Sequence, residues 1–460
     1  MEIAKYRRDE YEYFKCAYNQ TGYTVYPKKV AVTAGSSQAV WLDKDTLFKR
    51  KQQDGNHSIN WEDEIGMHHF IYQEEKGSFD DLAEVICYKL AKRLGTRQKV
   101  CNNGEVKTVP LVDCAEYRLA VYTDSKGYVQ HGCTSKNIAK DGEVLMVGAT
   151  LLSHLPEEEK VVYGRTTNTL GNHLKAVERH VNSMNTLSSV KTELDKDIPL
   201  ELKIRSAFCW KTSNSDNHSN NILYIQKVMP DGLRVLEVAT MIDNGAAWEM
   251  CGPLYPRYQG LVDGDSHHGQ TKIDENGNLV MLTDPFKHTA FALDAGNLNG
   301  HTKTFNGEQL DYEYDMVANA LADPEFYQAL YQMEQNFDIQ GVFEEITQEY
   351  RLKWPELSKE VITATCDYKS QILANVMTDY FCYSAYKQCV GPVDLENPTE
   401  LYETFRQGMK DLPLQESIEG YQQAFAEIAT KNNIAIPQES LTSVTFLPQN
   451  DPVQTDDVAQ

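Results

Sequence analysis

The sequence is short of positive charge, and it has no long apolar run. It contains 44 Lys and Arg residues against 67 Asp and Glu residues, which gives a formal net charge of −23. This balance argues against nucleic acid and anionic membranes as direct partners. No stretch approaches ~18 uninterrupted apolar residues, so we expect no membrane span. No basic start followed by an apolar run marks a secretory signal.

The sequence also has no Cys-x-x-Cys pair and no internal repeat. Its ten cysteines are scattered along 460 residues. In a chain of this length such cysteines are expected to be reduced, mostly buried thiols of a cytoplasmic protein. The length predicts two or three lobes or domains.

One polar stretch, residues 214–221, is followed by a predicted β-hairpin. Ile222 to Val228 has the apolar and β-branched residues of a strand. Met229 to Gly232 contains Pro and Gly and predicts a turn. Leu233 to Ile242 is predicted as the second strand, and it leads into Asp243-Asn244-Gly245.

A hairpin brings the start of its first strand beside the end of its second. A turn centred on Pro230-Asp231 places Asn221 near Thr240, and the same register places Asp243 near His218 and Asp216. Two carboxylates and a carboxamide would then converge, as phosphoryl transfer from a nucleotide requires. Asp/Asn/Ser clusters are more often simple turns. The second carboxylate, Asp243 at the end of the matching strand, favours a phosphoryl-transfer site over a simple turn.

The pattern Asp216-x-His218-x-x-Asn221, a hairpin, then Asp243-Asn244-Gly245 resembles the HipA-like serine/threonine protein kinases. These are bacterial kinases with an atypical two-lobed fold. The resemblance implies ATP and Mg²⁺ as cofactors, Asp216 as catalytic base and Asn221 and Asp243 as metal ligands. His218 would brace the loop. Aminoglycoside and choline phosphotransferases share the short motif, so the acceptor stays open.

Two further residues fit this family. Lys49 follows Leu47 and Phe48 on a predicted strand, which matches the phosphate-orienting lysine of the kinase fold, although Lys44 and Lys51 are rivals. Residues 78–95 predict a helix with one apolar face. Its Glu84 resembles the family glutamate that pairs with the strand lysine.

The N-terminal half contains two more stretches that resemble the family. Gly35, Ser36, Ser37 and Gln38 are similar to its glycine-serine nucleotide loop, which would cover the phosphates. Ser36 or Ser37 is a hypothetical autophosphorylation site. Residues 132–137 resemble the Gly-x-x-Ser-Lys-Asn strand, and residues 142–148 are expected to carry the adenine hinge.

The predicted fold class is α+β, with a two-lobed, protein-kinase-like architecture. The N-lobe is expected to be β-rich with one long helix, and the C-lobe to be mostly helical with a helical C-terminal extension. The expected domains are 1–145 (N-lobe), 146–310 (C-lobe with the catalytic loop), 311–447 (helical part) and 448–460 (disordered tail). Strands are expected at 109–122, with a turn at Asp113, and at 128–138. Helices are expected at 168–184, 199–210, 315–336, 339–353, 359–386, 397–410 and 417–432.

The leading hypothesis is an ATP- and Mg²⁺-dependent protein serine/threonine kinase of the bacterial cytoplasm, with delivery into a host cell left open. A small-molecule or lipid/inositol kinase and a non-catalytic nucleotide-binding scaffold are the alternatives. Only about 30 residues precede the nucleotide loop, and about 200 follow Asp-Asn-Gly. Toxin–antitoxin membership and an antitoxin-like or regulatory partner therefore stay open, as do the protein substrate and oligomeric state. Residues 263–268 are expected to form a solvated loop, not a metal site.

Overall fold

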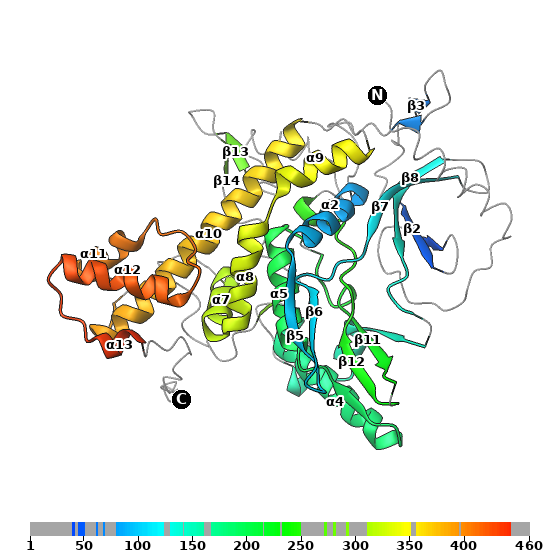
Figure 1. Cartoon of the computed structure of the whole chain (residues 1–460), viewed down its shortest axis with the longest axis horizontal. Coiled ribbons are helices and arrows are strands. Elements are labelled where there is room, and N and C mark those ends of the chain that lie inside the picture. Colours follow the sequence, from blue (N-terminus) through cyan, green and yellow to red (C-terminus); the bar gives the residue numbers. More distant parts are fainter. Residues whose placement is uncertain are drawn as a thin grey trace, which may run out of the picture. The chain divides into compact units, whose positions relative to one another are not determined.

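The computed structural model combines mostly antiparallel β-sheets with α-helices (Figure 1). It describes residues 39–41, 45–50, 61–62, 68–69, 80–123, 129–140, 142–160, 167–214, 216–230, 232–249, 271–273, 279–281, 291–293, 311–350, 356–394 and 397–442. The chain divides into two compact units. One comprises Met1–Ala292 with Gln332–Lys369, and the other Leu293–Tyr331 with Ser370–Gln460. The domain boundaries expected from the sequence stay a prediction.

The first sheet of the larger unit has the strand order β1-β2-β8-β7, and every pair in it is antiparallel. Its strands are β1 (Ala39–Trp41), β2 (Thr46–Arg50), β7 (Tyr117–Thr123) and β8 (Val129–Lys136). Lys49 pairs with Cys133, and the neighbouring Gly132 pairs with Arg50. A Cβ on Gly132 would lie 2.1 Å from the carbonyl oxygen of Lys49. Glycine at this position therefore lets β8 approach the strand that carries the lysine.

Helix α2 (Asp80–Arg93) packs against β7 and β8 of this sheet. Its apolar residues at helical spacing are fully buried, as predicted: Leu82, Val85, Ile86, Leu90. Acidic residues occupy the first turn and basic residues the last, which complements the helix dipole. Gly95, with φ of +84°, follows the helix.

A second sheet has the order β10-β12-β11-β9. Its strands are β9 (Val144–Val147), β10 (Thr192–Leu194), β11 (Leu223–Val228) and β12 (Arg234–Val238). The predicted β11–β12 hairpin is confirmed, but its register is shifted by one residue. Tyr224 pairs with Val238, so that Asn221 aligns with Met241 and not with Thr240. The turn between the two strands comprises residues 229–233, one residue more than the predicted turn over 229–232.

Three helices lie in the same part of the chain: α3 (Gly148–Ser153), α4 (Leu170–Leu187) and α5 (Ile198–Lys211). The predicted α4 and α5 are confirmed. Thr169 caps α4 by accepting a hydrogen bond from the backbone N–H of Asn172.

The strand expected over 109–122, with a turn at Asp113, is interrupted more widely in the structure. Residues up to Pro110 belong to a hairpin of β5 (Thr96–Val100) and β6 (Val106–Pro110), and β7 begins only at Tyr117. The charged side chains of β5 hid its strand character, because they pair with Asp195 and Asp197, just before α5, and not with their neighbours in sequence.

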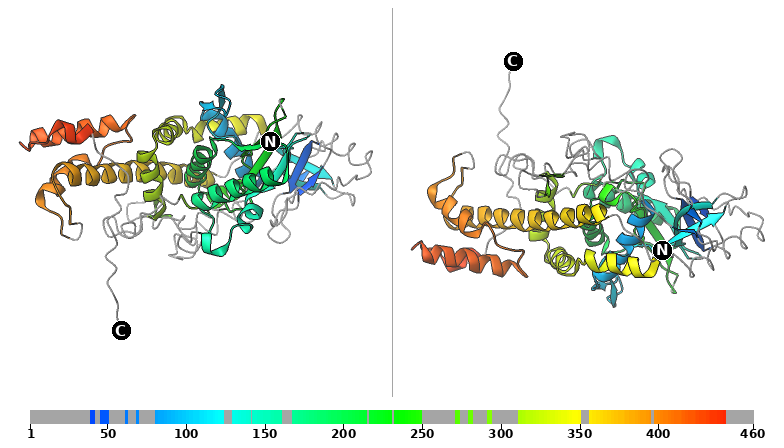
Figure 2. Two further views of the ribbon diagram at one scale, coloured as in Figure 1. Left: turned by 90° about the horizontal axis from the view of Figure 1, so that it is seen from below. Right: turned by 90° about the horizontal axis from the view of Figure 1, so that it is seen from above.

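The C-terminal part is helical in its described ranges. It contains α7 (Asp311–Ala322), α8 (Pro324–Asn336), α9 (Ile339–Tyr350), α10 (Glu356–Cys389), α11 (Glu400–Met409), α12 (Ile418–Lys431) and α13 (Gln438–Thr442). Figure 2 shows α10 as one continuous helix. The single helix expected over 315–336 is wrong, since Pro324 starts a new helix and the Asp323 carboxylate accepts from the N–H groups of Glu325 and Phe326.

The smaller elements are η1 (Glu157–Glu159), η2 (Ala247–Glu249) and the two-stranded pairs β3 (Trp61–Glu62) with β4 (His68–His69) and β13 (Thr271–Ile273) with β14 (Leu279–Met281). Eight cysteines lie in the described ranges, and all eight are free thiols. Within those ranges, none of the helices combines the length and the apolarity that a bilayer crossing requires. The α+β class is confirmed, with a β-rich N-terminal part that carries α2 and a mainly helical C-terminal part.

Candidate active site

Lys49 on β2 is the centre of a buried charge cluster. Its amine forms ion pairs with Glu84 on α2 and with Asp243, which follows β12. The side chain of Glu84 is fully buried, that of Lys49 is 12% exposed and that of Asp243 is 30% exposed. The structure therefore brings together three predicted site residues that are up to 194 positions apart in the chain.

Each residue of the Asp243-Asn244-Gly245 sequence contributes to this cluster. The backbone N–H of Asn244 donates to the second carboxylate oxygen of Glu84 at 2.7 Å. A Cβ on Gly245 would lie 3.4 Å from the Lys49 amine nitrogen and 3.1 Å from the Cβ of Asp80. Gly245 therefore leaves room for the lysine. Asp243 itself has φ of +61°, a left-handed conformation that Asp tolerates better than most residues.

The loop before β11 places Asp216, His218 and Asn221 together. The side-chain amide of Asn221 donates to the backbone carbonyl of Asp216 at 2.8 Å and to its carboxylate at 3.3 Å. His218 Nε2 lies 3.3 Å from the other carboxylate oxygen of Asp216. Asn221 is buried, whereas the side chain of Asp216 is 44% exposed. The carboxylate of Asp216 is thus accessible, and Asn221 and His218 hold it from two sides.

Backbone hydrogen bonds from the start of α3 also hold this loop. Gly148 N–H donates to the carbonyl of Ile222 at 2.8 Å, and Ala149 N–H donates to that of Ser219 at 2.9 Å. A Cβ on Gly148 would lie 2.9 Å from both of these carbonyl oxygens. Glycine is therefore needed where α3 meets the loop.

Sequence reasoning missed a third support of the loop, a buried histidine on α4. His173 lies between the side-chain oxygen of Asn168 and the hydroxyl of Tyr224, 2.7 Å from each. The amide of Asn168 in turn donates to the carbonyl of Asn217 at 3.2 Å. Burial, and to a lesser degree the charge of Arg205, lowers the pKa of His173 to about 3. The only available signal was a His at an apolar position of an amphipathic helix.

The carboxylates of the cluster have divergent pKa values. Burial raises the pKa of Glu84 to about 7, although Lys49 opposes the shift. Burial and the nearby charge of Asp243 raise the pKa of Asp216. Burial acts in the same direction on Asp243, but the charge and hydrogen bond of Lys49 outweigh it and lower the pKa of Asp243. A carboxylate with a raised pKa beside an ionised one is the arrangement that acid–base chemistry uses.

The donor set fits a hard divalent cation such as Mg²⁺. Asp243 and Asn221 supply carboxylate and amide oxygens, the ligand types that Mg²⁺ prefers. The Asn221 amide also contributes, after Lys49 and His218, to the lowered pKa of Asp243. Within the described ranges, no group of three or more His, Cys, Asp or Glu side chains forms a metal cage. Magnesium in phosphoryl transfer uses one or two carboxylates together with phosphate oxygens.

Three sequence-based expectations lie outside the described residues: the loop Gly35, Ser36, Ser37, Gln38, the segment 263–268 and the tail 448–460. The expected hinge, residues 142–148, contains β9, which is an edge strand of its sheet. The order of elements around the cluster is a lysine strand, a glutamate helix, an Asp/Asn loop, a hairpin and a second Asp. This is the order of a two-lobed, protein-kinase-like fold.

No protein-family model and no curated protein sequence matches this chain. Among solved structures, the chain is similar to the crystal structure of a Helicobacter pylori proinflammatory kinase, CtkA, with 12% sequence identity and a TM-score of 0.40. The match covers 76% of this chain and 93% of that chain.

Proposed function

We propose that the chain is an ATP- and Mg²⁺-dependent phosphotransferase, and that it is a protein serine/threonine kinase similar to the HipA-like kinases. One observation carries the proposal: a buried lysine is ion-paired both with a helix glutamate and with the Asp of an Asp-Asn-Gly sequence. Kinases use this lysine–glutamate pair to orient the nucleotide phosphates and this Asp to hold a metal ion.

The remaining roles follow from the position of each side chain. Asp216 is the accessible carboxylate of the loop and would position the acceptor hydroxyl and take its proton. Asn221 and Asp243 would hold Mg²⁺, and His218 would keep Asp216 oriented. The partly buried apolar side chains of Leu145 and Val147 on β9, and of Ile242 before Asp243, would contact the base of the nucleotide.

To test this proposal, the full chain is incubated with labelled ATP and Mg²⁺, with a cell lysate as the pool of protein substrates. Transfer of labelled phosphate to protein is measured. We expect Asp216→Ala to lower phosphate transfer by at least ~10²-fold, because it removes the general base. We expect Asp243→Ala to weaken Mg-ATP binding as well.

Asn220→Ala, an exposed neighbour of Asn221 in the same loop, is the matched control and should transfer phosphate at the wild-type rate. Undiminished protein labelling by Asp216→Ala would contradict the assigned base. ATP turnover on added small alcohols without labelling of any protein would instead indicate a small-molecule kinase.

A further inference from the structure

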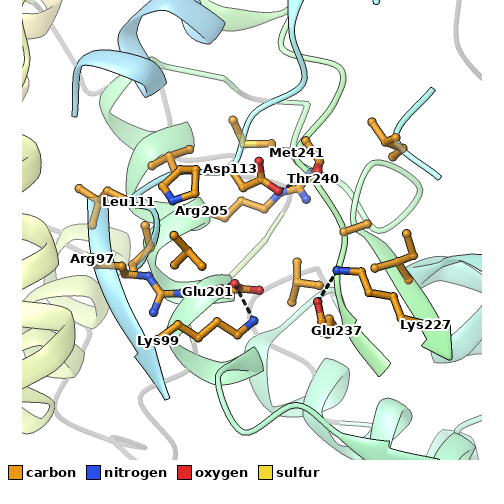
Figure 3. A pocket seen from close by; sticks show the side chains of 18 of the residues that line it. Arg97, Lys99, Leu111, Asp113, Glu201, Arg205, Lys227, Glu237, Thr240 and Met241 are labelled. Carbon is orange, nitrogen blue, oxygen red and sulfur yellow. Dashed lines mark hydrogen bonds and ion pairs between the residues drawn. The ribbon is translucent and has the colours of Figure 1, made fainter. Parts of the chain in front are cut away.

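The larger unit contains a cavity of about 320 Å³ that none of the proposed catalytic residues lines. Its walls come from the β5–β6 hairpin and the residues after it, from α5, and from β11, β12 and the segment between β8 and β9 (Figure 3). A volume of this size lies at the lower end for small-molecule sites in proteins. Lys49, Glu84, Asp216, Asn221 and Asp243 are absent from its lining.

Arg205 of α5 lines this cavity with an incompletely satisfied guanidinium. The residue is only 5% exposed. Its Nη2 donates to the backbone carbonyl of Asn221 at 2.5 Å, but its Nε and Nη1 have no hydrogen-bond partner in the structure. These two nitrogens carry three N–H donors. Figure 3 shows the side chain reaching toward Asp113 and Thr240.

Among the described residues, no carboxylate lies within ion-pair distance of Arg205. Asp113 is the nearest candidate, but one of its carboxylate oxygens accepts the hydroxyl of Thr240 at 2.7 Å. Burial without a counter-ion lowers the pKa of the Arg205 guanidinium, although the guanidinium stays protonated in proteins. An unpaired buried charge is costly, and an anion in the cavity would remove that cost.

Three of the four other cations of the lining pair with carboxylates, and the fourth, Lys140, is exposed. Arg97 pairs with Asp197 through a bidentate contact, and Lys99 pairs with Asp195. Lys227 pairs with Glu237 at 2.6 Å (Figure 3). Arg205 is therefore the buried cation of this lining that has room for a ligand.

Apolar side chains occupy part of the same walls: Leu111, Ile138, Ile204, Ile225, Met241. We propose that this cavity is a second ligand site, and that it binds a small organic anion whose carboxylate or phosphate group pairs with Arg205 while its apolar body contacts these side chains. The site is separate from the nucleotide cleft of the proposed function. It reaches the cleft through the Arg205–Asn221 hydrogen bond.

The test uses benzoate and phenyl phosphate as probes, which distinguish a carboxylate from a phosphate, and benzyl alcohol as the neutral control. Binding to the nucleotide-free full chain is followed by calorimetry and by the rise in thermal midpoint. We expect one anion to bind with 1:1 stoichiometry, and Arg205→Gln to weaken it by at least ~10-fold, the usual effect of losing hydrogen bonds to a charged group. Benzyl alcohol should bind at least ~10-fold more weakly than that anion.

Three variants make the result specific. Arg205→Lys keeps the positive charge but loses the guanidinium fork, so it should fold even if Arg205→Gln does not, and should bind the anion several-fold more weakly. Arg179→Gln removes a half-exposed arginine of α4 and should bind as the wild type does. Lys49→Met removes the cation of the cleft and should also leave binding unchanged.

Equal anion affinity of the wild type and of either Arg205 variant would overturn the proposal. So would loss of binding in Lys49→Met, which would place the anion in the cleft, or failure of both anions to bind at millimolar concentration. A kinetic measurement also tests the proposal, and it rests on the proposed function. The bound anion should change the KM for ATP in the wild type but not in Arg205→Gln. Absence of any phosphate transfer would contradict the proposed function and leave the binding result standing.

Discussion

At the scale of single residues, the cluster around Lys49 contains one cation and two carboxylates in a largely dry environment. Glu84 has no exposed surface, and Asn244 N–H and Lys49 are its partners. The two partners stabilise the ionised form of Glu84, whereas burial disfavours it. Its protonation state is therefore coupled to folding.

We expect Glu84→Gln to remove a pH dependence of stability. The pKa of Glu84 is about 7 in the folded chain against an ordinary value of 4.5. Between these pH values the folded chain binds the proton more tightly than the unfolded chain, so stability falls as pH rises from 4.5 to 7. The shift corresponds to roughly 3 kcal/mol at most. Unfolding in urea at several pH values measures the effect. The free energy of unfolding of Glu84→Gln, relative to that of the wild type, should increase as pH rises from 4.5 to 7.

Glu105→Gln is a matched control because Glu105 is exposed on the β5–β6 hairpin. It should give a curve parallel to that of the wild type. A constant difference between Glu84→Gln and the wild type over the whole pH range would contradict the assignment.

At the scale of elements, helix α2 is clamped by α9. The amine of Lys89 forms ion pairs with Glu345 and Glu349, and Arg93 pairs with Asp338. A second hydrogen bond runs from Arg93 to the carbonyl of Gly341 at 3.0 Å. The helix that carries Glu84 is therefore held at its C-terminal half by a segment about 250 residues later in the chain.

Lys89→Met should loosen α2 while preserving most of the apolar stem. The lysine is buried and its two glutamate partners are partly exposed. Removing such ion pairs costs about 1 kcal/mol, so we expect amide hydrogen exchange in residues 80–93 to become about five-fold faster. Exchange followed by mass spectrometry measures the change. Lys92→Met, at an exposed position of the same helix, is the control, and an equal effect of both substitutions would argue against the clamp.

The sequence allowed prediction of those elements whose signals are local. The β11–β12 hairpin follows from Pro and Gly beside alternating apolar residues, and α2 follows from the helical spacing of its apolar residues. The strand β5 could not be recognised, because its charged residues Arg97 and Lys99 find their partners a hundred positions away. The hairpin register was missed because it depends on turn length, which composition does not determine.

Non-adjacent contacts also explain what was missed in the candidate site. The pairing of Lys49 with Glu84 was suggested by a family pattern, whereas the second partnership of Lys49 with Asp243 was not. Nothing local in the sequence distinguishes His173 from an ordinary core histidine. Its role emerges only when Asn168 and Tyr224 are seen on either side of it.

At the scale of the whole molecule, the smaller unit has its own aromatic core. Phe425 is fully buried and stacks on Phe405 with a centroid distance of 4.2 Å. It also contacts Phe381 edge-on. The residues of this cluster come from α10, α11 and α12, so the unit does not depend on the sheets for its core.

Phe425→Ala should destabilise this unit by about 3–5 kcal/mol, because it opens a cavity in a packed core. All five tryptophans belong to the larger unit: Trp41, Trp61, Trp210, Trp248, Trp354. We therefore expect the helical circular-dichroism transition to shift to lower denaturant while the tryptophan fluorescence transition stays in place. Phe425→Leu, which keeps most of the volume, should cost below about 1.5 kcal/mol. Coincident shifts of both signals would show instead that the two units unfold as one.

The double pairing of Lys49 has a consequence for the order in which substrates bind. In the proposed function, the polyphosphate of a nucleotide would compete with Asp243 for the same amine. A divalent cation that engages the Asp243 carboxylate would release the lysine toward the polyphosphate. Metal and nucleotide should then each tighten the other's affinity by an equal factor, and neither should bind well alone.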